Sequence, residues 1–205
     1  FHLKAPGAKI PGRVGHAAFD FEDGTLLLTE ASTKKRASMH ITRGRGSLAE
    51  FDRGGLEVLG SSLEQFHVAL IKENHTIKRT LTDPRLFSAI GNAYSDEILH
   101  RARLSPLKLT RQLTGDEVTS LHRAAIDTLQ EWIDRLRKET GDSFPEKVTA
   151  FRAEMAVHGR FGKPCPVCGS KVQRIVYAEN ECNYCARCQT AGKLLSDRSL
   201  ARLLK

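Results

Sequence analysis

The chain has no cysteine in its first 164 residues, and all five of its cysteines lie between Cys165 and Cys188. The first 22 residues show no basic start followed by an apolar run, so no secretory signal is visible. The longest apolar runs, such as Leu26 to Leu28, are far too short to span a membrane. A P-loop, a dinucleotide fingerprint and internal repeats are also absent. Because neither a secretory signal nor a membrane span is visible, we expect a reducing compartment, in which clustered cysteines more often bind metal than form disulfides.

The spacing of the cysteines supports a metal site. Cys165-x2-Cys168 and Cys185-x2-Cys188 are two identical knuckles separated by sixteen residues. Each knuckle can place two thiolates on one face of a tight turn, and together they complete a tetrahedron around Zn²⁺. A closed site of four thiolates has no open position for water, so we predict one structural zinc ion. Cys182 does not fit the pattern and is interpreted as a bystander or a competing thiol, while redox pairing and chance clustering are the less favoured interpretations.

The charge balance favours an anionic partner. The chain carries a formal net charge of +8 with a pI near 9.4. Residues 161–205 contain eight Lys or Arg against three acidic residues, a net charge of +5. A basic surface binds phosphate backbones through counterion release, although an ordinary solvated basic surface has the same composition.

Residues 1–58 have the pattern of a partial N-terminal β-sandwich. The stretch HAAFDFEDGTLLLTEA predicts a hairpin with its turn at Asp23-Gly24, and a further strand is predicted through Met39 and Ile41. The chain opens on Phe1 within the apolar phrase FHL, from which we expect a fragment that lacks its N-terminal start.

Residues 61–155 have the pattern of a helical domain. Ser62 with Gln65 and Thr114 with Glu117 form capping boxes, the second of which opens a long amphipathic helix that ends near Gly141. Its apolar stripe is predicted to be core rather than a binding groove. The stripe consists of Val118, Leu121, Ala125, Leu129, Trp132 and Leu136. Histidines such as His67, His100 and His122 are interpreted as solvated or packed side chains.

Two motifs resemble one known family. AIGNAYSDEILHRARLSP resembles the helix–two-turn–helix signature of the formamidopyrimidine-DNA glycosylase / endonuclease VIII family, and VHGRFGKPCPVCGSKVQRI…NYCARCQ resembles its C-terminal zinc finger. The order of the parts also agrees. The resemblance implies an α+β multidomain protein with a β domain at 1–58, a helix–two-turn–helix DNA-binding domain at 61–155, and a zinc finger with its tail at 156–205.

The resemblance also implies DNA contacts. The family's motif asparagine matches Asn92, and its preceding lysine matches Lys78; both would hold a phosphate of the damaged strand. Gly91 and Tyr94 lie beside Asn92 in the first motif, Arg160 precedes the first knuckle in the second motif, and all three are expected to contribute. From the residues alone, Asn92 could instead be a helix N-cap and Lys78 a solvated charge.

The family's chemistry starts from an N-terminal proline followed by a glutamate, and the proline amine forms a Schiff base with the sugar before strand cleavage. No catalytic residue of this kind is found among these 205 residues. We therefore expect a bifunctional DNA glycosylase / AP lyase of base-excision repair whose catalytic pair is absent from this chain. On this interpretation the 205 residues alone are inactive.

Three positions depart from the family pattern. The phosphate-clamping arginine of the zinc hairpin falls at Asn180, a wedge methionine falls at Ala5, and the usual wedge loop is replaced by ASTKKRASM with Lys34 to Arg36. These departures argue against the usual preference for oxidised purines. They keep open an alternative: a non-catalytic, zinc-containing protein that binds DNA or RNA. The expected partner is damaged double-stranded DNA, and no membrane partner is expected. We expect the protein to be a monomer. Its expected location is the cytoplasm, at the nucleoid, if the source is bacterial, and the nucleus if it is eukaryotic.

Overall fold

The computed structural model describes residues 1–145, 149–177 and 180–196. Its residues group into two compact units, one of Phe1–Phe51 with Leu136–Thr149 and one of Asp52–Arg135 with Ala150–Lys205. The predicted helical and zinc parts therefore share one unit. Within the described ranges, no helix is both long enough and apolar enough to cross a membrane.

The first unit holds a three-stranded antiparallel sheet in the order β1-β3-β2. The strands are β1 His2–Lys4, β2 Gly15–Phe21 and β3 Gly24–Thr29, and the 3-10 helix η1 spans Gly46–Phe51. The hairpin prediction is confirmed, but Phe21 pairs with Gly24, so the turn consists of residues 22–23 rather than Asp23-Gly24. The strand predicted through Met39 and Ile41 is wrong: this segment pairs with no strand of the described sheet, and Ile41 is 88% exposed.

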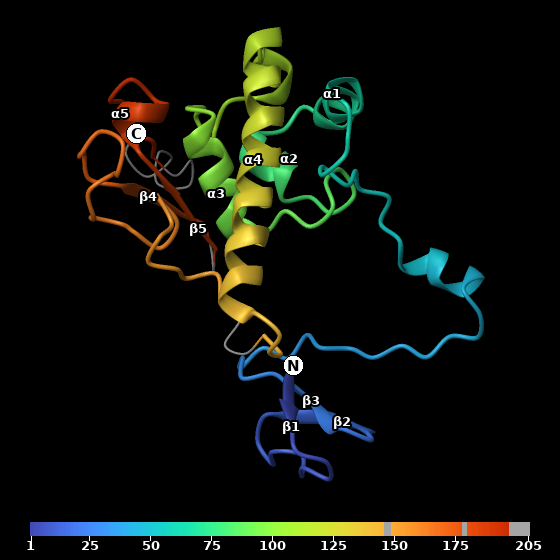
Figure 1. Cartoon of the computed structure of the whole chain (residues 1–205). Helices are drawn as coiled ribbons and strands as arrows, with labels where there is room; N and C mark the ends of the chain where they lie inside the picture. Colours follow the sequence, from blue (N-terminus) through green and yellow to red (C-terminus); the bar gives the residue numbers. More distant parts are fainter. Residues whose placement is uncertain (146–148, 178–179, 197–205) are drawn as a thin grey trace. The chain divides into compact units, whose positions relative to one another are not determined.

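The second unit begins with helices, two of which start at a capping box. They are α1 Leu63–Ile71, α2 Ile77–Leu81, α3 Asn92–Arg101 and α4 Gly115–Thr140, with the 3-10 helix η2 at Thr110–Gln112 (Figure 1). The end of α4, from Leu136 on, belongs to the first unit. Both predicted capping boxes form, since Ser62 exchanges bonds with Gln65 and Thr114 with Glu117. Such boxes satisfy orphan N–H groups of the first helical turn.

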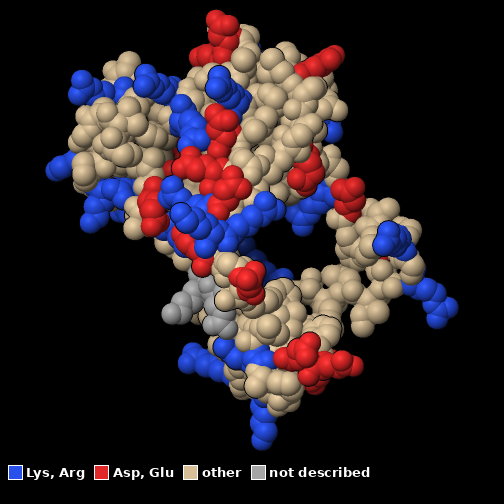
Figure 2. All heavy atoms as spheres, in the orientation of Figure 1, with Lys and Arg blue, Asp and Glu red and all other residues tan. Residues whose placement is uncertain are grey.

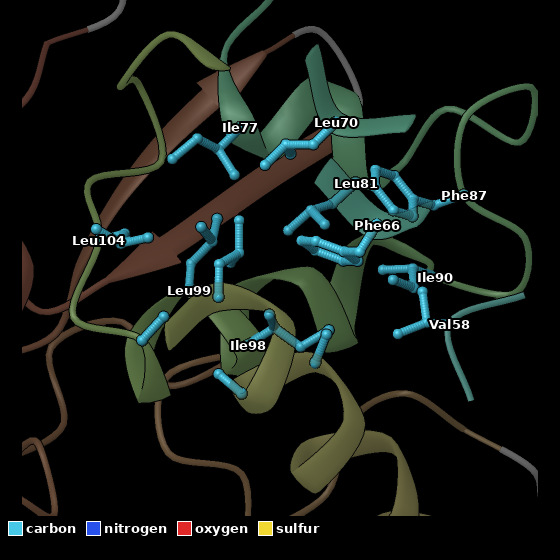
Figure 3. Packing of buried hydrophobic residues seen from close by; sticks show 14 of the residues in the cluster. Val58, Phe66, Leu70, Ile77, Leu81, Phe87, Ile90, Ile98, Leu99 and Leu104 are labelled. Carbon is cyan, nitrogen blue, oxygen red and sulfur yellow. The ribbon is translucent and has the colours of Figure 1, made fainter. Parts of the chain in front are cut away.

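The helices enclose one hydrophobic core, which Figure 3 shows from close by. It draws its residues from Val58 to Ala125, with Phe66 packed on Phe87 at a ring separation of 4.9 Å. Val118, Leu121 and other residues of the predicted α4 stripe are buried in it, which confirms their assignment to core. Because this cluster takes no residue from the zinc part, the helices carry a core of their own.

The zinc part is a small hairpin followed by a single helical turn. Strands β4 Gln173–Tyr177 and β5 Asn180–Tyr184 pair antiparallel, and α5 spans Ala186–Gln189. Both strands lie between the two cysteine knuckles. In Figure 1, β5 runs beside α3, and contacts between these two elements position the site described below.

Candidate metal centre and nucleic-acid interface

The four knuckle cysteines come together as predicted. Their sulfur atoms all lie within 4.8 Å of one another, with Cys165 and Cys188 at 3.9 Å and Cys168 and Cys185 at 3.4 Å. Ligands at about 2.3 Å from a tetrahedral Zn²⁺ lie about 3.8 Å from one another. The donor set and its spacing therefore fit zinc.

Local backbone bonds shape the two knuckles. The Cys165 N–H donates to Ser170, and the Gly169 N–H donates back to the Cys165 carbonyl, with Gly169 at a φ of 75° that favours glycine. In the second knuckle, buried Gln189 accepts from the Cys185 N–H. The amide of Gln189 also donates to the Leu104 carbonyl just beyond α3, so this side chain joins the knuckle to the helical part.

Cys182 stands apart from the four-sulfur group. It pairs opposite Ile175 and is buried in a separate small cluster with Tyr184 and Ala186. Burial raises the pKa of its thiol, and the nearby Asp96 carboxylate acts in the same direction. A protonated, buried thiol is a poor metal ligand, which agrees with its interpretation as a bystander.

The start of α3 carries the two residues expected at a phosphate site. Gly91 is the N-cap in an extended conformation, and no described residue other than its two chain neighbours comes within 4 Å of the place where a Cβ atom would lie. Asn92 is the first helical residue, so the N-cap alternative is wrong for it. Its side-chain Nδ2 donates to the Glu181 carbonyl of β5 at 2.9 Å. One of its two amide hydrogens remains for another acceptor.

Lys78 of α2 lies beside Asn92 but points inward. Its Nζ donates to the Asn92 carbonyl at 2.6 Å, to Ser95 Oγ at 2.8 Å and to Asp96 Oδ1 at 2.6 Å. An ammonium group has three donors, and all three are used here. The side chain is 13% exposed. The phosphate contact of Lys78 remains a prediction, and the described contacts give this residue a second task, which is to hold the first turn of α3.

Two consecutive carboxylates of α3 fasten the zinc part to the helices. Fully buried Asp96 accepts from Lys78 through one oxygen, and from His158 Nδ1 at 2.8 Å and the Asn183 N–H at 3.1 Å through the other. Glu97 accepts the backbone N–H groups of residues 156, 157 and 158 at 2.7 to 2.9 Å. Each buried charge is thus satisfied by partners that include segments about sixty or more residues away.

Tyr94 and Arg160 lie elsewhere in this unit. The Tyr94 ring packs edge-on against Trp132 at 6.0 Å, and burial raises the pKa of its hydroxyl. Arg160 donates through Nη1 to the Ala153 carbonyl, while its Nε is buried without a partner among the described residues. No contact described for these residues joins either side chain to Asn92, and their predicted DNA contacts stay predictions.

A hollow of about 550 Å³ lies where α2, α3 and β5 meet. Lys78, Asn92, Leu107 and Cys182 contribute to its lining, together with Arg79. The Arg79 guanidinium is exposed, and it has no hydrogen bond or ion pair to any described residue. A helix N-terminus, a free amide hydrogen and a solvated guanidinium together make a place for an anion.

The lining of this hollow includes residues of both charges, Lys78 and Arg79 on one side of the balance and Glu181 on the other. Figure 2 shows basic side chains gathering over the part of the molecule that holds β4, β5 and α5, with acidic side chains between them and the helices. Some of the basic groups are paired, as Arg174 is with Glu181 at 3.2 Å. Asn180 belongs to β5, but its side chain lies outside the described part of the structure.

Comparison with known proteins assigns the family. The formamidopyrimidine-DNA glycosylase H2TH domain matches residues 59–143, and the zinc finger found in FPG and IleRS matches residues 162–191. A Mycobacterium tuberculosis protein described as an uncharacterized formamidopyrimidine-DNA glycosylase-like protein is 39% identical over 151 residues, which is 74% of this chain and 94% of that protein. The chain belongs to the formamidopyrimidine-DNA glycosylase family.

Two other relatives are longer than this chain. The formamidopyrimidine-DNA glycosylase of Desulforamulus reducens is 31% identical over 185 residues, and that of Thermus thermophilus is 37% identical over 131 residues. The matches cover 86% and 62% of this chain, but only 65% and 49% of those two proteins.

Solved structures of the family share the fold. The structure of Lactococcus lactis FPG (MutM) in complex with a FAPY-dG containing DNA has a TM-score of 0.73 and 27% sequence identity to this chain. The match covers 92% of this chain and 70% of the Lactococcus lactis chain. For the MutM (FPG) protein from Thermus thermophilus, the match covers 91% of this chain and 71% of that protein's chain, with 30% identity and a TM-score of 0.70. The predicted family, and the α+β fold with its H2TH domain and zinc finger, are thereby confirmed.

Sequence reasoning missed several residues of this family member's site. Asp96, Glu97, His158 and Asn183 form the junction between the H2TH domain and the zinc finger, and Arg79 faces the hollow. The one available signal was the pair Asp96-Glu97 on the apolar side of a helix, next to Ile98 and Leu99. Charged residues in that place are buried only when they have partners.

Proposed function

We propose that this chain binds DNA as part of a base-excision repair glycosylase that removes damaged bases and cleaves at the resulting abasic sites. The observation that carries the proposal is the hollow at the start of α3, where an open helix N-terminus, Asn92 and Arg79 meet beside the zinc hairpin. Relatives of this chain are named formamidopyrimidine-DNA glycosylases, and the Lactococcus lactis FPG (MutM) is crystallised with a FAPY-dG containing DNA. The lyase step rests on the family resemblance alone.

In this proposal one Zn²⁺ is held by Cys165, Cys168, Cys185 and Cys188. Its four sulfur ligands leave no position for water or substrate, so its contribution is structural. The ion would fix both knuckles and thereby the β4–β5 hairpin, which receives the amide of Asn92 at the Glu181 carbonyl.

A backbone phosphate would enter the hollow along the axis of α3. The first N–H groups of a helix point outward without intrahelical partners, and no side chain caps this end. Asn92 can keep its bond to Glu181 and donate its second amide hydrogen to a phosphate oxygen. Arg79 would add a direct charge-assisted bond, whereas Lys78 would act through its nearby positive charge while it holds the Asn92 carbonyl.

Asn92→Ala tests this assignment. A hydrogen bond to a charged acceptor contributes roughly 1.5–3 kcal/mol, so affinity for duplex DNA containing an abasic-site analogue should fall about ten- to a hundred-fold. Fluorescence anisotropy at one fixed salt concentration measures this, with thermal melting of the same sample. The control is Asn74→Ala, because exposed Asn74 has only a long bond to the Arg111 N–H and lies outside the lining of the hollow.

A phosphate contact and a purely structural role of Asn92 predict different combinations of DNA affinity and melting temperature in this variant. If the side chain served only to tie α3 to Glu181, the variant would melt earlier by an amount worth about 1 kcal/mol, and the affinity of the folded protein would not change. That result would remove Asn92 from the DNA interface.

A second candidate is a binding protein on the same scaffold without glycosylase chemistry, acting on DNA or RNA. The observation in its favour is the Mycobacterium tuberculosis relative, since a match of 151 residues already spans 94% of that protein. That relative is therefore a much shorter protein than the longer glycosylases of the family.

Borohydride trapping on abasic-site DNA examines the chemistry of these 205 residues directly. The proline amine that the family uses is not among them, and Lys78 is occupied by three acceptors, so we expect no covalent adduct. A family member that carries the proline serves as the positive control. A trapped adduct with this chain would show that another amine, such as an exposed lysine, attacks the sugar.

A further inference from the structure

Helix α3 reaches the metal centre with one side chain of its last turn. His100 Nε2 lies 3.3 Å from the sulfur of Cys165. The two residues are 6% and 2% exposed, so water does not compete for this contact. His100 comes from the H2TH domain, 65 residues before the cysteine that it touches.

The chemistry of the contact fixes its direction. A cysteine that ligates zinc is a thiolate and has no proton to give, so the hydrogen must be on His100 Nε2. An N–H···S⁻ bond withdraws charge from the sulfur and fixes its orientation. Removal of a residue that hydrogen-bonds to a metal ligand typically weakens metal affinity 10- to 100-fold.

We propose that His100 is a positioning residue of the zinc centre, donating from Nε2 to the Cys165 thiolate and joining the metal to the helix that begins at Asn92. The inference rests on the zinc site proposed above and adds to it a ligand partner outside the zinc finger. Gln189 and Glu97 also join the two parts, but they bond to backbone groups, whereas His100 bonds to a metal-ligating atom.

The consequence concerns both ends of α3. Asn92 at its start donates to Glu181 in β5, and His100 near its end donates to Cys165 in the first knuckle. Metal loading would thus hold the helix at two points, one of them at the proposed phosphate site. A cavity of about 310 Å³ is lined in part by His100 and Cys188.

The test compares His100→Phe and His100→Gln with the unchanged chain, all with metal bound. Phenylalanine keeps the ring without the donor, and glutamine restores an N–H at a similar reach. We expect His100→Phe to hold zinc 10- to 100-fold more weakly in chelator competition. In the Co²⁺-substituted protein its sulfur-to-cobalt charge-transfer band should move to lower energy. His100→Gln should stay within about threefold of the unchanged chain, as a donor of the same hydrogen bond would.

His122→Phe is the matched control, because His122 also packs in the H2TH domain, on Phe66 at 4.9 Å, but contacts no cysteine in the described structure. It should leave zinc affinity and the cobalt spectrum unchanged. Equal zinc affinity and an unchanged band in His100→Phe would overturn the inference. So would equal losses in the Phe and Gln variants, including failure of both to fold with metal. Absence of zinc from the unchanged chain would instead refute the proposed metal site itself.

Discussion

The Asp96→Asn variant is expected to lose about 3–5 kcal/mol of its free energy of unfolding. Asp96 is fully buried and holds Lys78, His158 and the Asn183 N–H through its two oxygens. Asparagine has nearly the same shape, but it removes the negative charge and turns one acceptor into a donor. Lys78 would then keep a largely buried positive charge without its counter-ion.

Denaturant unfolding of the metal-loaded protein measures the loss. The control is Asp116→Asn, since Asp116 is an exposed aspartate in the first turn of α4, and its replacement should change stability by no more than about 0.5 kcal/mol. A loss of less than about 1 kcal/mol in Asp96→Asn would show that the junction is relaxed or hydrated in solution.

A double-mutant cycle separates the ion pair from its surroundings. Lys78→Met removes the buried cation and leaves Asp96 with His158 and Asn183. If the pair is coupled as its 2.6 Å separation indicates, the combined variant should be more stable than the sum of the two single losses predicts. Additive losses would mean that the carboxylate acts mainly through the zinc-finger side of the junction.

Features with local signals were predictable from the sequence. The capping boxes at Ser62 and Thr114 and the double cysteine knuckle each lie within a few residues and depend on fixed spacing. The strand predicted through Met39 and Ile41 does not form, because an alternating pattern alone does not supply a partner strand, and both side chains are exposed. A strand needs a neighbour as much as it needs a pattern.

The junction could not be predicted for a different reason. The family resemblance predicts a phosphate contact for Lys78, and the residues alone allow a solvated charge, but its acceptors include the side chain of Asp96, 18 residues away in the sequence. Likewise, nothing near His100 in the sequence indicates a contact with Cys165. These pairings arise only when α2, α3 and the hairpin are packed together, and the composition of each segment does not report them.

Removal of the metal is expected to have the largest effect on the zinc finger and a much smaller one on the helices. Structural zinc contributes about 10–16 kcal/mol to the folding of zinc-finger peptides, and the cluster around the four cysteines adds few apolar residues beyond Val157 and Val172. Without the ion, four sulfur atoms would be left close together with nothing to hold them. The hairpin should therefore unfold.

The helices should remain, because their core contains no residue of the zinc finger. Circular dichroism after chelation should keep most of its helical signal, while cysteines that are buried in the loaded protein become reactive to a thiol reagent. Affinity for DNA should also fall, since Asn92 loses its partner at Glu181, and Asp96 and Glu97 lose theirs at 156–158 and Asn183.

Two serine variants identify the ligands. Metal analysis of the purified protein should find one zinc per chain, and Cys185→Ser should lose it because three thiolates cannot close the site. Cys182→Ser should keep one zinc, since the Cys182 thiol is buried in another cluster and its raised pKa keeps it protonated. The reverse pattern, with zinc lost in Cys182→Ser and kept in Cys185→Ser, would mean that the hairpin is in a different register when metal is bound. Asn92 and Glu181 would then no longer face each other, and the proposed phosphate site would fail together with the ligand assignment.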